Sequence, residues 1–154
     1  MNSDLLIQVI LLSILPISEL RGAIPLAIIS GGSSWFFYVV VSVLANIAII
    51  PVIFYFLDHI NVVLLKFDFY RKLFDKWVVR TRKKVEKHIG TKWEYPAIYL
   101  FVAIPLPMTG AYTGVLAAWL FGMNRAKVYR YLISGVITAG IIVTLVTLFF
   151  TSVF

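Results

Sequence analysis

Hydrophobic residues fill the chain in long blocks that are interrupted at a few places. Four such blocks cover residues 5–34, 35–58, 95–124 and 128–154, and a stretch of mixed polarity covers 61–94. A helix that crosses a bilayer needs about 20 residues, so the second and fourth blocks are predicted transmembrane helices. The pattern predicts an all-α integral membrane protein.

The blocks 5–34 and 95–124 are each too long for one straight span and too short for two. Both contain proline and glycine in the middle, and proline removes a hydrogen bond from a helix interior and clashes with the preceding turn. We therefore expect two re-entrant helical hairpins, with broken backbone that must be buried in protein or line a watery cavity. The predicted hairpin breaks are Pro16, Gly22 and Pro25 in the first, and Pro105, Pro107, Gly110 and Gly114 in the second.

Basic residues predict the orientation of these elements. Of the 14 lysines and arginines, ten lie between Lys66 and Lys92 and three lie at Arg125, Lys127 and Arg130. Lysine and arginine concentrate in cytoplasmic loops of membrane proteins, so both flanks of the second hairpin should be cytoplasmic. The chain is then a multi-pass protein of the cell membrane with both termini outside. The two hairpins enter from opposite sides, which predicts an inverted repeat in which each hairpin is followed by a transmembrane helix.

Residues 61–94 differ from the rest of the chain because aromatic and aliphatic residues recur there at three- and four-residue spacing. Phe69, Phe74 and Trp77 belong to this apolar stripe, and seven lysines and arginines occupy the opposite face. Such a pattern is typical of a basic amphipathic helix that lies along a membrane surface.

Composition supports one membrane domain over residues 1–154. The chain is 61% hydrophobic and 14% charged, whereas soluble domains carry about 25% charged residues. The net charge of +7 could indicate nucleic acid, but most of the chain would be insoluble outside lipid, so nucleic-acid binding is not expected. With no cysteine and only two histidines, the sequence predicts no metal site and no cofactor.

Ionisable residues at membrane depth are costly and usually functional. Glu19 and Arg21 lie in the middle of the first hairpin, and they are the first candidates for binding substrate or protons. The alternative is a structural pair that fixes the broken backbone. Thr109, Tyr112 and Thr113 of the second hairpin would face them across the inverted repeat, although hydroxyls are equally common as links between membrane helices.

Two motifs carry a family resemblance. The segments Pro16-Ile-Ser-Glu-Leu-Arg-Gly-Ala-Ile-Pro25 and Pro105-Leu-Pro-Met-Thr-Gly-Ala-Tyr112 resemble the signatures of the putative small multidrug export family. That family is more distantly similar to the DedA group, or VTT-domain group, of membrane proteins. The resemblance implies paired re-entrant hairpins and a role in moving lipids, including polyprenyl phosphates, across bilayers.

These observations favour a transporter, not an enzyme. The hairpins would form a midplane site in which Arg21 binds an anionic, amphipathic or lipid-linked substrate of the polyprenyl-phosphate or phospholipid type, and Glu19 exchanges a proton. One alternative is a proton-coupled exporter of cationic drugs. Another is a membrane-shaping scaffold that acts on lipids through its basic helix. Because so few helices can enclose two hairpins, we expect a homo-oligomer, with a dimer as the simplest form.

Overall fold

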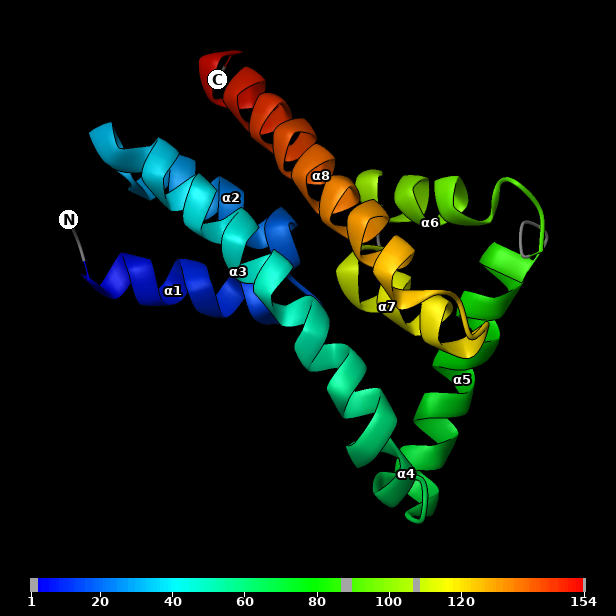
Figure 1. Cartoon of the computed structure of the whole chain (residues 1–154). Helices are drawn as coiled ribbons and strands as arrows, with labels where there is room; N and C mark the ends of the chain where they lie inside the picture. Colours follow the sequence, from blue (N-terminus) through cyan, green and yellow to red (C-terminus); the bar gives the residue numbers. More distant parts are fainter. Residues whose placement is uncertain (1–2, 87–89, 107–108, 154) are drawn as a thin grey trace.

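The computed structural model describes residues 3–86, 90–106 and 109–153, and the regular elements of these residues are helices (Figure 1). The two predicted transmembrane segments form the longest helices, α3 (Trp35–Tyr55) and α8 (Arg125–Val153). With the short turns on either side of it, α3 belongs to a helical stretch of 29 residues, the same length as α8, and both are apolar enough to cross a membrane. At 1.5 Å per residue each is about 43 Å long, more than the roughly 30 Å of a hydrocarbon core.

Two pairs of short helices occupy the segments predicted as hairpins. The first pair is α1 (Ser3–Ile14) and α2 (Glu19–Ser30), and the second is α6 (Glu94–Ala103) and α7 (Ala111–Leu120). A single 3-10 turn, η1 (Gly32–Ser34), joins α2 to α3. Helices of 10 to 12 residues are about 15–18 Å long, which is too short to cross a bilayer alone.

The packing follows the same scheme in both halves of the chain. The first helix pair packs on α3 and the second on α8, while α2 also contacts α8, α7 also contacts α3, and the two long helices contact each other. The start of α3 lies near the end of α8, so these helices are antiparallel (Figure 1). This common scheme is what an inverted repeat requires, but the repeat itself and the re-entrant path of the pairs stay predictions.

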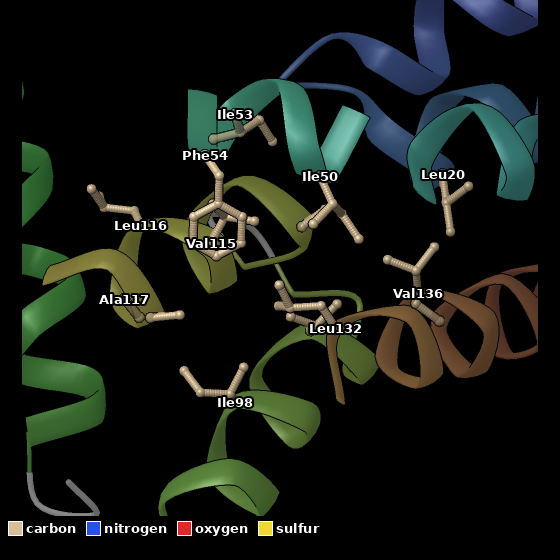
Figure 2. Close-up of a cluster of buried hydrophobic side chains, with 14 of the residues drawn as sticks. Leu20, Ile50, Ile53, Phe54, Ile98, Val115, Leu116, Ala117, Leu132 and Val136 are labelled. Atoms are coloured by element: carbon tan, nitrogen blue, oxygen red, sulfur yellow. The ribbon is translucent and has the colours of Figure 1, made fainter. Parts of the chain in front are cut away.

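The core lies where the two helix pairs meet the long helices. Figure 2 shows buried side chains from α2, α3, α6, α7 and α8 converging on one region, among them Leu20, Ile50, Ile98, Val115 and Leu132. These side chains are almost completely hidden from the surroundings. The central segments of both halves are therefore held against each other by apolar packing.

Small residues permit close approach of the helices. A Cβ added at Gly114 of α7 would lie 2.5 Å from Val102 of α6 and 2.8 Å from Leu132 of α8. On α8, a Cβ at Gly135 would lie 2.8 Å from Val102, and a Cβ at Gly140 would lie 2.7 Å from Val43 of α3. Glycine at these positions lets the helix backbones come together, as is common in membrane interfaces.

The mixed-polarity segment 61–94 is not one helix. The helix that contains α3 continues through a π-helical turn, η2 (Phe56–Ile60), into α4 (Asn61–Leu64), and the amphipathic helix proper is α5 (Asp68–Val85). The chain bends between α4 and α5, where the Tyr70 hydroxyl donates to Asn61 Oδ1 at 2.8 Å. The first four residues of the segment thus extend the helix that contains α3 and do not belong to α5.

The apolar stripe of α5 is divided between protein and surroundings. Phe74 and Thr81 are buried, and α5 packs on α7, whereas Phe69 and Leu73 are exposed. The helix is therefore docked on the second helix pair by part of its apolar face. The remaining apolar surface is exposed, and the interfacial position of α5 stays a prediction.

Candidate functional site

Arg21 reaches from the first helix pair to the second. It lies on the first turn of α2, and its guanidinium donates through Nη1 to the Leu106 carbonyl and through Nη2 to the Thr109 carbonyl at 3.3 Å. Both acceptors lie in the broken segment between α6 and α7, whose carbonyls are not used by a helix. Arg21 therefore stabilises the broken backbone between α6 and α7.

Glu19 also extends to the second helix pair, but it contacts backbone N–H and not carbonyl groups. Its carboxylate lies at the N-terminus of α7, where the Tyr112 N–H donates to Oε1 at 3.4 Å. The residue is buried and adopts a left-handed conformation with a φ of 46°. An N-terminus favours a negative charge because its amides and the helix dipole point at the anion.

Gly110 makes this arrangement possible. Its φ of 116° and ψ of −165° lie in a region that is essentially restricted to glycine. A Cβ at this position would lie 2.0 Å from Glu19 Oε2. Both the conformation of the backbone and the position of the carboxylate therefore require glycine here.

The hydroxyl-bearing candidates hold the two breaks in place. Thr109 Oγ1 accepts a hydrogen bond from the Leu106 N–H at 3.1 Å and lies 2.9 Å from the Ile104 carbonyl, which closes the segment after α6. The Tyr112 hydroxyl donates to the Ile14 carbonyl at the end of α1. Thr113 Oγ1 donates to the Gly110 carbonyl at 3.4 Å. These contacts fit the structural interpretation of the hydroxyls, and they place all three side chains beside Glu19 and Arg21.

A cavity of about 320 Å³ opens between the two helix pairs. Its walls combine charged, hydroxyl and aromatic side chains: Pro16, Ile17, Glu19, Arg21, Trp77, Thr109, Tyr112 and Thr113. The structure thus brings together the five residues that the sequence singled out for substrate or proton binding. Trp77 of α5 was not among them, because the sequence assigned it to the lipid-facing stripe of the amphipathic helix.

The comparison with protein families agrees with this arrangement. A family model described as "Putative small multi-drug export protein" matches residues 19–142, from the first residue of α2 to the middle of α8. The chain belongs to this family. Searches of curated proteins and of solved structures gave no match. Membership in an export family, together with the two long apolar helices, makes the chain a membrane protein of a transport class, which is not a class of enzymes.

Three of the predicted breaks are wrong. Gly22 and Pro25 lie inside α2, and Gly114 lies inside α7, so none of the three interrupts a helix. Pro25 is tolerated because α2 is packed on both α3 and α8, with Ile24 and Ala27 completely buried, so that packing outweighs the loss of one hydrogen bond.

Among the described residues the breaks lie at 15–18, 104–106 and 109–110, and they contain three of the predicted positions, Pro16, Pro105 and Gly110. A fourth, Pro107, lies outside the described residues.

A second charged cluster joins the ends of three helices. Asp58, in the π-helical turn after α3, accepts two hydrogen bonds from Arg125 at 2.7 Å each and one from the Trp119 indole at 3.0 Å. The Arg125 guanidinium also lies 5.0 Å from the centre of the Phe54 ring. The available signal for Asp58 in the sequence was an acidic residue near the end of a long apolar stretch.

No metal centre is formed by the described residues, in which no group of three histidine, aspartate or glutamate side chains could hold an ion.

Proposed function

We propose that this family member is a small transporter that moves an anionic, amphipathic or lipid-linked molecule through a site between its two helix pairs. The observation that carries the proposal is that Arg21 and Glu19 both extend from the first pair into the break of the second, beside a cavity of about 320 Å³. Unused helix ends and broken backbone at membrane depth are a recurrent way to bind charged substrates. Arg21 would bind the anionic head group, since guanidinium groups match phosphate and carboxylate geometry.

Glu19 would couple transport to protons. Its carboxylate is buried and contacts the break of the second pair, so a change in its charge would change the contact between the two halves. Loss of the negative charge weakens the attraction to the N-terminus of α7. Proton exchange at Glu19 would then alternate the two helix pairs between arrangements that open the cavity to one side or the other.

The proposed membrane arrangement follows from the helix lengths and the charges. The helices of each pair are about half as long as a bilayer is thick, so both pairs would enter and leave from one side, as re-entrant hairpins of an inverted repeat. The basic segments would be cytoplasmic and both termini outside. A homodimer would cover the lipid-exposed sides of the helix pairs.

Binding of dodecyl phosphate tests the proposal. Arg21→Gln should weaken binding about tenfold or more, which is about 1.4 kcal/mol, because hydrogen bonds to charged groups contribute about 1.5–3 kcal/mol. The matched control, Arg130→Gln, removes the same charge from an exposed site on α8 and should leave binding unchanged. Arg21→Lys keeps the charge without the planar fork and should fold and bind with intermediate affinity.

Glu19→Gln should lose the part of the pH dependence of dodecyl phosphate binding that comes from the Glu19 carboxyl, because an amide does not titrate. The part that comes from the second ionisation of the phosphate, with a pKa of about 6, remains in both proteins. Equal binding by the wild-type protein, Arg21→Gln and Arg130→Gln would contradict the role of Arg21. Unchanged pH dependence in Glu19→Gln would remove Glu19 from the mechanism.

A second candidate is the export of cationic drugs. It is favoured by the family description and by the cavity itself, in which the Glu19 carboxylate stands beside the aromatic rings of Trp77 and Tyr112. Dodecyltrimethylammonium has the same chain as dodecyl phosphate and the opposite charge. If it binds more tightly than dodecyl phosphate, and if Glu19→Gln abolishes this binding, the cation exporter is the correct function.

A further inference from the structure

A larger and almost wholly apolar groove lies next to the charged cavity. Its volume is about 450 Å³, within the range of about 300–1,000 Å³ that is usual for ligand pockets. One wall is the last part of α3 and its π-helical turn, and the other is the aromatic face of α5. The residues that line it are Pro16, Ile49, Val52, Ile53, Phe56, Leu57, Tyr70, Leu73, Phe74, Trp77 and Tyr112.

The groove and the charged cavity share three wall residues, namely Pro16, Trp77 and Tyr112. On one side of them lie Glu19 and Arg21, and on the other side the lining is hydrocarbon and aromatic ring. Tyr112 is held in place by the hydrogen bond from its hydroxyl to the end of α1. A single elongated molecule could therefore contact both spaces, with its charged end and its apolar end separated by these three side chains.

We propose that the groove between α3 and α5 binds the hydrocarbon chain of the same amphiphile whose anionic head lies at Arg21. This inference rests on the proposed function and adds a chain-binding site to it. It also gives α5 a second role. The aromatic face of α5 becomes a wall of the substrate site, and Trp77 stands at the junction between head group and chain.

Burial along the groove supports entry from the lipid side. Phe74 is 8% exposed and forms a closed wall, whereas Leu73 and Val52 are each 55% exposed and lie at the open edge. The polar end of Tyr70 is bonded to Asn61, so it does not offer an unpaired hydroxyl to the groove. A lipid-borne chain could enter between α3 and α5 without passing through water, while its head group approaches Arg21.

The test compares a long and a short ligand with the same head. Displacement of radiolabelled dodecyl phosphate and of radiolabelled butyl phosphate is measured on the full chain in nanodiscs. Leu73→Trp fills the open edge of the groove. It should weaken the binding of dodecyl phosphate at least tenfold and change the affinity for butyl phosphate less than twofold. Val52→Trp fills the same edge from α3 and should give the same result if Leu73→Trp does not fold.

Two controls separate this inference from the proposed function. Val79→Trp adds an indole to an exposed part of α5 outside the groove, and both ligands should keep their wild-type affinity. Arg21→Gln should weaken both ligands, because both carry the phosphate.

If Arg21→Gln weakens both ligands but neither groove variant weakens dodecyl phosphate, the chain site is wrong and the proposed function stands. A second outcome is that the groove variants weaken binding of the long ligand only, while Arg21→Gln weakens binding of neither. The groove would then bind the chain, but the proposed role of Arg21 would be wrong. The inference that one molecule occupies both spaces would be overturned with it. Equal weakening of both ligands by Leu73→Trp and Val52→Trp would also overturn the chain site.

Discussion

The two charged clusters neutralise their charges in different ways. At the ends of the long helices, Asp58 and Arg125 pair directly at 2.7 Å, with 24% and 51% of their side chains exposed. Between the helix pairs, the Glu19 carboxylate accepts from the Tyr112 amide of α7, and the Arg21 guanidinium donates to carbonyls of the break before α7. The first cluster pairs side chain with side chain, and the second pairs side chains with backbone.

This difference has a consequence for what each cluster can do. An ion pair between side chains depends on its two members and acts as a clamp, here between α3 and α8. Charged side chains that are hydrogen-bonded to backbone groups depend on the path of the broken segment, so these hydrogen bonds change when that path changes. The central cluster is therefore suited to couple ligand binding to movement, whereas the Asp58 cluster is suited to hold helix ends together.

The largest effect is expected from glycine substitutions that compare the two regions. Gly110→Ala should cost about 4 kcal/mol, because a Cβ would overlap Glu19 and because the backbone conformation is essentially restricted to glycine. Gly122, near Arg125, has a φ of 60° and open space around it, so Gly122→Ala should cost only about 1 kcal/mol. Thermal unfolding in detergent measures both. Equal losses of stability would show that the central cluster is no more constrained than the helix ends.

A smaller effect is expected from reversing charges. Asp58→Arg or Arg125→Asp alone should destabilise the protein by about 1 kcal/mol, because partly exposed ion pairs contribute about 0.2–1 kcal/mol and reversal adds repulsion. The double variant should recover the ion-pair part of this loss but not the hydrogen bond from the Trp119 indole to Asp58, because arginine has no acceptor. Exchanging Glu19 and Arg21 should not restore stability, because their partners are a backbone amide and backbone carbonyls, which stay in place. Thermal unfolding of the single and double variants checks both statements, and recovery of the central exchange would contradict the backbone pairing.

Much of the architecture could be predicted from the sequence because membrane physics restricts the choices. Apolar length gave the two long helices, and 30-residue blocks with central prolines indicated broken helix pairs. The exact breaks could not be predicted, because Pro25 remains helical only through packing by residues distant in the sequence. Glu19 and Arg21 were found from their charge at membrane depth.

The individual partners of Glu19 and Arg21 are backbone groups. Every residue has such groups, so the sequence does not show which of them are used. The same limit applies to Asp58, whose partner Arg125 is 67 residues away. It also applies to Trp77, whose position in the cavity wall depends on how α5 docks on α7.

The smallest perturbation comes from single cysteines, which the cysteine-free chain makes easy to interpret. Three exposed residues serve as labelling sites: Ser33 in η1 before α3, Lys127 at the start of α8, and Ile17 in the first break. Under the proposed topology, an impermeant thiol reagent should label Ser33→Cys only from outside and Lys127→Cys only from the cytoplasm. Ile17→Cys should react more slowly than either, because it would lie near the midplane and be reached through the cavity. Labelling of Ser33→Cys and Lys127→Cys from the same side would contradict the topology. Fast labelling of Ile17→Cys would place the central cluster at the surface, where the contrast with the Asp58 cluster would lose its meaning.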